Sequence, residues 1–172
     1  TTTSINAQHH LADLSNYRAS FQACFEQFYG KPKDWAILAL LPSYLEREGS
    51  SLIYMMDSLI AQSKNEHSGF YLDDLAKLNA LLLELEQQKQ PTLLLGVSFA
   101  LLDFTEQYSL NLSSTTVMDT GGMKGRRKEL TREELHKTLQ KGFGVSAIHS
   151  EYGMTELPVS YTHLTLPTKR IV

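Results

Sequence analysis

Short apolar runs alternate with longer amphipathic segments along the chain, and this alternation constrains the fold more than any other feature. The runs are "WAILALLP", "PTLLLGVS", "TTVMDTGG" and "VSAIHS". The first, at 35–42, is apolar throughout, which is typical of a strand buried on both faces. Strands that alternate with helices pair in parallel through right-handed crossovers. The sequence therefore predicts an α/β fold with a three-layer, mostly parallel sheet flanked by helices.

The amphipathic segments predict the helices, because their apolar residues recur at three- and four-residue steps. Helices are expected over 13–29, 51–63, 72–89, 99–108 and 131–144. The last has the clearest ends, since Thr131 and Glu134 match a T-x-x-E capping box and Gly142 supplies a C-terminal stop. Gly96 is expected to form the turn between a strand at 93–95 and the helix after it.

Composition narrows the class of protein. With 172 residues, 42% of them hydrophobic, the chain is long enough for one compact domain. A net charge of −3 does not indicate nucleic acid or an anionic membrane as a partner. The single cysteine, Cys24, cannot form an internal disulfide, which favours a reducing compartment. No run of about 18 apolar residues occurs, so we expect no transmembrane segment and a cytoplasmic location.

Three loops leave the predicted strand ends, at 42–51, 119–128 and 150–156. In parallel sheets, ligands bind outside the carboxyl ends of the strands. Gly121 and Gly122 let a flat ligand lie against backbone, and the last loop offers an aromatic ring, a hydroxyl and a carboxylate. These groups match the base, phosphates and magnesium ion of a nucleotide. Glycine pairs also mark ordinary turns, so the residues alone leave both interpretations open.

The order of these motifs resembles the acyl-adenylate-forming enzymes. The stretch 121–156 places a glycine-rich loop, a helix, a strand and a Tyr-Gly-x-Thr-Glu signature in that family's order. Within the superfamily the chain most resembles the acyl-protein synthetases of bacterial bioluminescence, the LuxE-like fatty acid ligases. The segments "LLPSYLEREGSSLIYM" and "TLLLGVSFALLDF" are similar to that family too. The resemblance covers 1–156 and implies part of the large N-terminal domain of an adenylate-forming enzyme.

The resemblance implies roles for individual residues. Gly121, Gly122 and Met123 would line the adenine and ribose, and Tyr152 would stack on the adenine. Thr155 would contact phosphate and Glu156 would help hold magnesium, which makes these two the implied catalytic residues. Four further residues complete the implied nucleotide site: Gly153 and Met154 from the same signature, and Thr1 and Thr2, which resemble the end of the family's Ser-Gly-Thr-Thr phosphate loop.

The implied reaction uses ATP and Mg²⁺. A fatty acyl carboxylate attacks the α-phosphate to give acyl-AMP and pyrophosphate, and the acyl group then passes to a thiol acceptor. That acceptor is an acyl-reductase partner, another protein thiol or coenzyme A, and the acyl chain length is open. Two anions must meet, so positive groups are needed. The basic residues Lys124, Arg126, Arg127 and Lys128 lie near in sequence, although a solvated basic cluster is the favoured interpretation for each of them.

The C-terminal residues do not fit the family pattern. The segment 159–168, "VSYTHLTLPT", is the translation of a string similar to the transposon-end adapter of sequencing libraries. We therefore expect 1–157 to be a partial acyl-adenylating domain and 158–172 to be a non-native tail. Because the chain also begins without Met, we expect an internal fragment that has no complete catalytic cycle alone.

Two other functions remain open from the residues. Ser98 lies in a G-x-S-x-A stretch between strand and helix, and Asp119 with His136 or His149 follows in the order of an α/β-hydrolase. The alternative function is thus a serine acyltransferase that uses Ser98. The leucine-rich segment "LNALLLELEQQ" is either a partner surface or, as we favour, a helix packed on the sheet.

Overall fold

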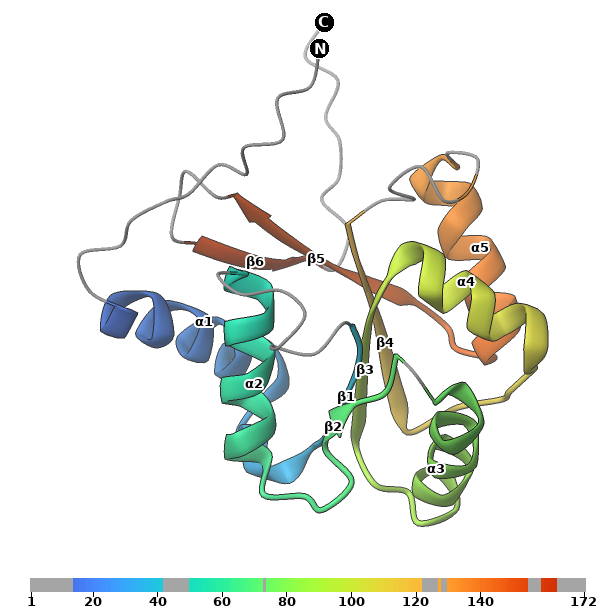
Figure 1. Ribbon diagram of the computed structural model, residues 1–172, viewed down its shortest axis with the longest axis horizontal. Coiled ribbons are helices and arrows are strands. Elements are labelled where there is room, and N and C mark those ends of the chain that lie inside the picture. The colour runs from blue at the N-terminus through green and yellow to red at the C-terminus, as the bar shows by residue number, and fades with distance from the viewer. Residues whose placement is uncertain are drawn as a thin grey trace, which may run out of the picture.

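A parallel sheet forms the middle layer of the molecule (Figure 1). This computed structural model describes residues 14–41, 50–72, 74–121, 127, 130–154 and 159–163, with the backbone alone at 152–154 and 159–163. Within these residues the strand order is β2-β1-β3-β4-β5-β6. The five parallel strands are β1 (Ala36–Leu40), β2 (Gly69–Phe70), β3 (Thr92–Val97), β4 (Thr115–Thr120) and β5 (Ile148–Met154). At one edge, β6 (Val159–His163) pairs antiparallel with β5.

Helices cover both faces of this sheet, as the sequence predicts. Helices α1 (Leu14–Tyr29) and α2 (Ser51–Ser63) lie on one face. On the other face lie α3 (Leu75–Gln87), α4 (Ser98–Gln107) and α5 (Arg132–Phe143) (Figure 1). A single 3₁₀ turn, η1 (Pro32–Asp34), connects α1 to β1. The predicted three-layer α/β fold is confirmed.

The core follows from the doubly covered central strands. All five residues of β1 are fully buried, and the six residues of β3 beside it are buried too. Such strands have no solvent face, which explains their continuous apolar sequence. The leucines of α3 at 78, 81, 82 and 85 are buried in the core. This supports the interpretation that the helix packs on the sheet rather than forming a partner surface. None of the described helices is long and apolar enough to cross a membrane.

Two glycines serve close packing where the sequence predicted a turn and a stop. Gly96 lies inside β3, and a Cβ there would be 2.8 Å from the Leu101 side chain of α4. Gly142 lies inside α5, where a Cβ would be 2.5 Å from Cβ of Thr105 on α4. The helix instead ends at Phe143 and is capped by Gly144, whose φ of 66° is left-handed. The Thr131–Glu134 capping box is confirmed.

The last parallel strand lies further along the chain than predicted. We expected a strand over 145–150 followed by a loop, but β5 begins at Ile148 and continues to Met154. Its pairing with β4 ends at Thr120↔Glu151, whereas its pairing with β6 runs from Ser150↔His163 to Met154↔Val159. The short β2 was not predicted. The domain boundary at 157 and the non-native origin of 158–172 stay predictions.

Candidate functional site

The last paired rows of β4 and β5 bring together the first residues of two segments that the sequence predicted as loops, 119–128 and 150–156. Asp119 pairs with Ser150, and Thr120 pairs with Glu151 in the last row of the β4–β5 ladder. Because the strands are parallel, their carboxyl ends point toward the same edge of the sheet. Gly121 follows β4 directly with a left-handed φ of 69°. The first predicted site residue therefore lies one position beyond this row.

A polar cluster faces α5 at this edge. The Ser150 hydroxyl donates to Oδ1 of Asp119 at 2.6 Å, and Nε2 of His136 lies 3.0 Å from the same oxygen. Arg132, one helical turn before His136, donates from Nη2 to the Ser150 hydroxyl at 3.1 Å. The side chains of Asp119 and His136 are only 9% and 14% exposed. We call these four residues the Asp119 cluster.

The opposite face of the same strands carries a second pair of contacts. The Thr120 hydroxyl donates to Oε2 of Glu151 at 2.7 Å. Two rows from the end, Nδ1 of His149 lies 2.6 Å from the hydroxyl of Tyr29 on α1. Burial lowers the pKa of His149 and raises the pKa of Tyr29, so the tyrosine hydroxyl donates to a neutral imidazole.

We expect this buried His149 to make stability depend on pH. A folded pKa below the unfolded value of about 6.5 means that the unfolded chain binds more protons between those two values. The contribution of neutral His149 to the free energy of unfolding is therefore complete above about pH 6.5, and it is lost as the pH falls through the folded pKa. Urea unfolding of the wild type and His149→Asn between about pH 5.5 and 7.5 measures the difference. A difference that does not change with pH would contradict the expectation.

The hydroxyl of Ser98 is bonded to the backbone rather than to the side chains of the other hydrolase candidates. Its side chain is fully buried, and its hydroxyl donates to the carbonyl oxygen of Gly121 at 3.0 Å. Asp119 and His136 instead pair with each other and with Ser150. The described contacts thus bring two hydrolase candidates together without the proposed nucleophile. Ser98 fixes the backbone at Gly121.

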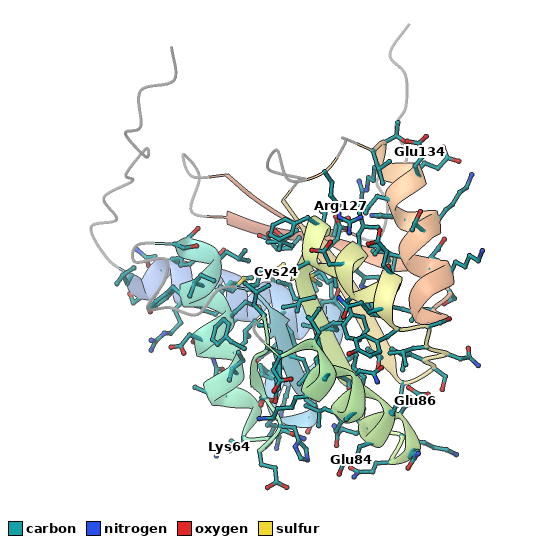
Figure 2. All side chains as sticks on the ribbon, turned by 45° about the vertical axis from the view of Figure 1, so that its right-hand side comes forward. Cys24, Lys64, Glu84, Glu86, Arg127 and Glu134 are labelled. Atoms are coloured by element: carbon teal, nitrogen blue, oxygen red, sulfur yellow. The ribbon has the colours of Figure 1, made fainter. Side chains whose placement is uncertain are left out.

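Arg127 is held by carboxylates of α4. Its guanidinium donates to Asp103 through Nε and Nη2, and to both carboxylate oxygens of Glu106 at 2.6 and 2.7 Å. Bonds to Glu106 and then Asp103 hold the pKa of Arg127 above its usual value. Figure 2 shows Arg127 near the end of the molecule where Glu134 opens α5, with Lys64, Glu84 and Glu86 at the other end. The Arg127 guanidinium is thus paired with carboxylates of the protein itself. The other three basic residues, Lys124, Arg126 and Lys128, lie outside the described residues.

The other predicted site residues divide into two groups. Tyr152, Gly153 and Met154 form the end of β5, where the backbone alone is described. The rest lie outside the described residues: Thr1, Thr2, Gly122, Met123, Thr155 and Glu156. The predicted nucleotide and magnesium contacts therefore stay predictions. In the part of the chain that the structure describes, no group of three His, Cys, Asp or Glu side chains is placed to hold a metal ion.

Sequence reasoning missed Ser150 and Arg132. Two signals were available: the four-residue spacing of Arg132 and His136 on a helix face, and the matching position of Asp119 and Ser150 near the ends of neighbouring strands. A surface depression of about 450 Å³ lies elsewhere, between α1 and α2. Its lining includes Arg18, Tyr54 and Asp57, and none of the predicted site residues.

Comparison with known proteins supports the fold class. The chain has a parallel α/β sheet with its polar residues at the carboxyl edge, and a solved ligase shares this fold. That structure is the R395G mutant form of coronafacic acid ligase from Pectobacterium brasiliense, with a TM-score of 0.50 and 20% identity. The match covers 77% of this chain and 24% of that one, so the chain spans about a quarter of the ligase's length. No protein-family model and no curated protein matches the sequence.

Proposed function

We propose that this chain is part of an adenylate-forming ligase that uses ATP to convert an acyl carboxylate to acyl-AMP. One observation carries the proposal: Gly121 and Tyr152 each directly follow the last paired row of β4 and β5, at the same edge of the parallel strands, and Tyr152 is the first residue of the Tyr-Gly-Met-Thr-Glu sequence. The ligase-like fold supports it, as does the order of the motifs. The finer proposal is an acyl-protein synthetase of the LuxE-like type, acting on a fatty acid in the cytoplasm, with a thiol of a reductase or another protein as acceptor.

The chemistry of adenylation suits this edge. Attack of a carboxylate on the α-phosphate brings two anions together, and bound Mg²⁺ would supply the charge neutralisation that this needs. Gly121 lacks a side chain, so a base or ribose can approach its backbone. The Ser98 hydroxyl holds the Gly121 carbonyl at 3.0 Å, which orients the start of that loop. Thr155 and Glu156 come directly after β5 and are proposed to meet phosphate and Mg²⁺.

We expect the chain to bind Mg·ATP, and Glu156→Gln to weaken that binding at least about tenfold, or about 1.4 kcal/mol. The reason is that the amide keeps the size of the side chain but removes the charge that attracts the metal. Titration calorimetry measures both proteins. Binding is the chosen readout because it needs only the nucleotide site.

The matched control is Glu133→Gln. Glu133 is a carboxylate on the exposed side of α5, paired with Lys137 at 2.8 Å, and its side chain is 78% exposed. We expect this variant to bind Mg·ATP like the wild type. If the wild type binds no Mg·ATP, or if both variants bind equally, the proposed nucleotide site is wrong.

A further inference from the structure

We propose that the Asp119 cluster is a positioning device that fixes the ends of β4 and β5 relative to each other. This inference rests on the proposed function, because those ends carry the residues proposed to hold the nucleotide. Asp119 is two residues before Gly121, and Ser150 is two residues before Tyr152. A shift between the two strands would therefore move the two halves of the nucleotide site apart. Arg132, His136 and Ser150 would be positioning residues that need not touch ATP.

The geometry suits this role because one helix holds both strands. Asp119 and Ser150 are partners in the ladder, and their hydroxyl–carboxylate bond joins the strands by side chains as well as backbone. His136 contacts both, at 3.0 Å from the Asp119 carboxylate and 3.3 Å from the Ser150 hydroxyl. Arg132 adds a contact to Ser150. The first half of α5 thus contacts both strands at the row before the last one of the β4–β5 ladder.

The position along the strands separates this cluster from ordinary core packing. Two residues earlier on the same face, Val117 pairs with Ile148, and both are buried apolar side chains. Apolar contacts stabilise packing without fixing a direction, whereas hydrogen bonds depend on both distance and angle. On this face, the change from apolar to directional contacts occurs between the Val117–Ile148 row and the Asp119–Ser150 row, near the end of the β4–β5 ladder.

The opposite face of β4 and β5 also has a side-chain contact at the end of their ladder. Thr120 and Glu151, in the last row, are joined by a hydrogen bond of 2.7 Å. Ser98, at the start of α4 on the same face as α5, holds the Gly121 carbonyl. The final two rows are therefore joined by side-chain hydrogen bonds on both faces of the sheet, Asp119 with Ser150 on one face and Thr120 with Glu151 on the other.

Three single variants test the inference: Ser150→Ala, His136→Ala and Ser150→Thr. We expect the two alanine variants to weaken Mg·ATP binding about tenfold and to speed amide hydrogen exchange at Gly121 and at 152–154. Ser150→Thr keeps the hydroxyl and should retain near-wild-type affinity. Lys137→Ala is the matched control, because Lys137 is the next residue on α5 and its side chain is 72% exposed.

The readouts separate positioning from plain stability. All dissociation constants are measured at a temperature where circular dichroism shows each variant to be fully folded. A cluster that only stabilises the fold would lower the melting temperature and leave the dissociation constant unchanged. We also expect the double variant Ser150→Ala/His136→Ala to bind no more weakly than the product of the single effects, because the two residues share one network.

Two outcomes would overturn the inference. One is unchanged Mg·ATP affinity in the folded alanine variants. The other is unchanged amide exchange at Gly121 and 152–154, which shows that the cluster does not fix the strand ends. Failure of the wild type to bind Mg·ATP overturns the proposed function instead, and the exchange measurement still decides whether the cluster holds the two strands together.

Discussion

Replacing Phe143 by alanine is expected to lower the free energy of unfolding by roughly 3–5 kcal/mol. Phe143 is fully buried at the end of α5, and its ring stacks on Phe104 of α4, with centroids 5.4 Å apart and planes at 10°. Truncation removes this contact and leaves a cavity between two helices. Because a domain of this kind is stable by only about 5–15 kcal/mol, much of its stability would be lost. Urea unfolding followed by circular dichroism measures the change.

The control for Phe143 is Phe28→Ala on α1. Phe28 is 47% exposed, so its truncation should change the free energy of unfolding by less than about 0.5 to 1 kcal/mol. The same chemical change is thereby made at a buried and an exposed site. Equal effects at the two positions would show that α5 does not pack on α4 as described.

The sequence predicted the elements well where a single period dominates. The buried run of β1 and the helical period of α2 each agree closely with the structure. The predicted roles of Gly96 and Gly142 were wrong. Each glycine is needed because a Cβ there would overlap a side chain of another element, which the local sequence does not reveal. A glycine that lets two elements approach looks the same in one dimension as a glycine that ends a helix.

The predicted end of β5 was wrong for another long-range reason. Its extension to Met154 depends on pairing with β6, and no local property of Tyr152 or Gly153 indicates such a partner. The two-residue β2 is too short to produce a period at all. Strand ends that depend on the position of a neighbouring strand could thus not be predicted from the local sequence pattern.

Only the neighbourhood of the candidate site was predictable. The alternation of strands and helices, with the carboxyl-edge rule, predicted that the segments beginning at Asp119 and Ser150 lie at one edge of the sheet, and these two residues are paired in the structure. The Asp119 cluster needed the register of β4 against β5 and the rotation of α5, neither of which a motif encodes. Two of the hydrolase candidates, Asp119 and His136, do contact each other. The serine that they contact is Ser150, whereas Ser98 donates to the Gly121 carbonyl.

The second large effect is expected at Gly144, where alanine should cost roughly 2–5 kcal/mol through backbone strain and overlap together. Gly144 caps α5 with a φ of 66°, and an added Cβ would lie 2.5 Å from Cα of Asn111 and 2.6 Å from the carbonyl oxygen of Leu110. That neighbouring segment cannot move away freely. Its backbone N–H groups at Leu110 and Leu112 donate to the carbonyl oxygens of Gly142 and Phe143.

Gly30→Ala provides the comparison that separates the two causes. Gly30 ends α1 with a similar φ of 75°, but no atom lies within 4 Å of the position where its Cβ would be. Only the left-handed backbone is penalised there, at roughly 1–2 kcal/mol. The difference between the two alanine variants in urea unfolding therefore measures the contact between α5 and the 110–112 segment. Equal losses would mean that this contact relaxes without cost, so that the C-terminal end of α5 is less firmly held than its hydrogen bonds to Leu110 and Leu112 indicate.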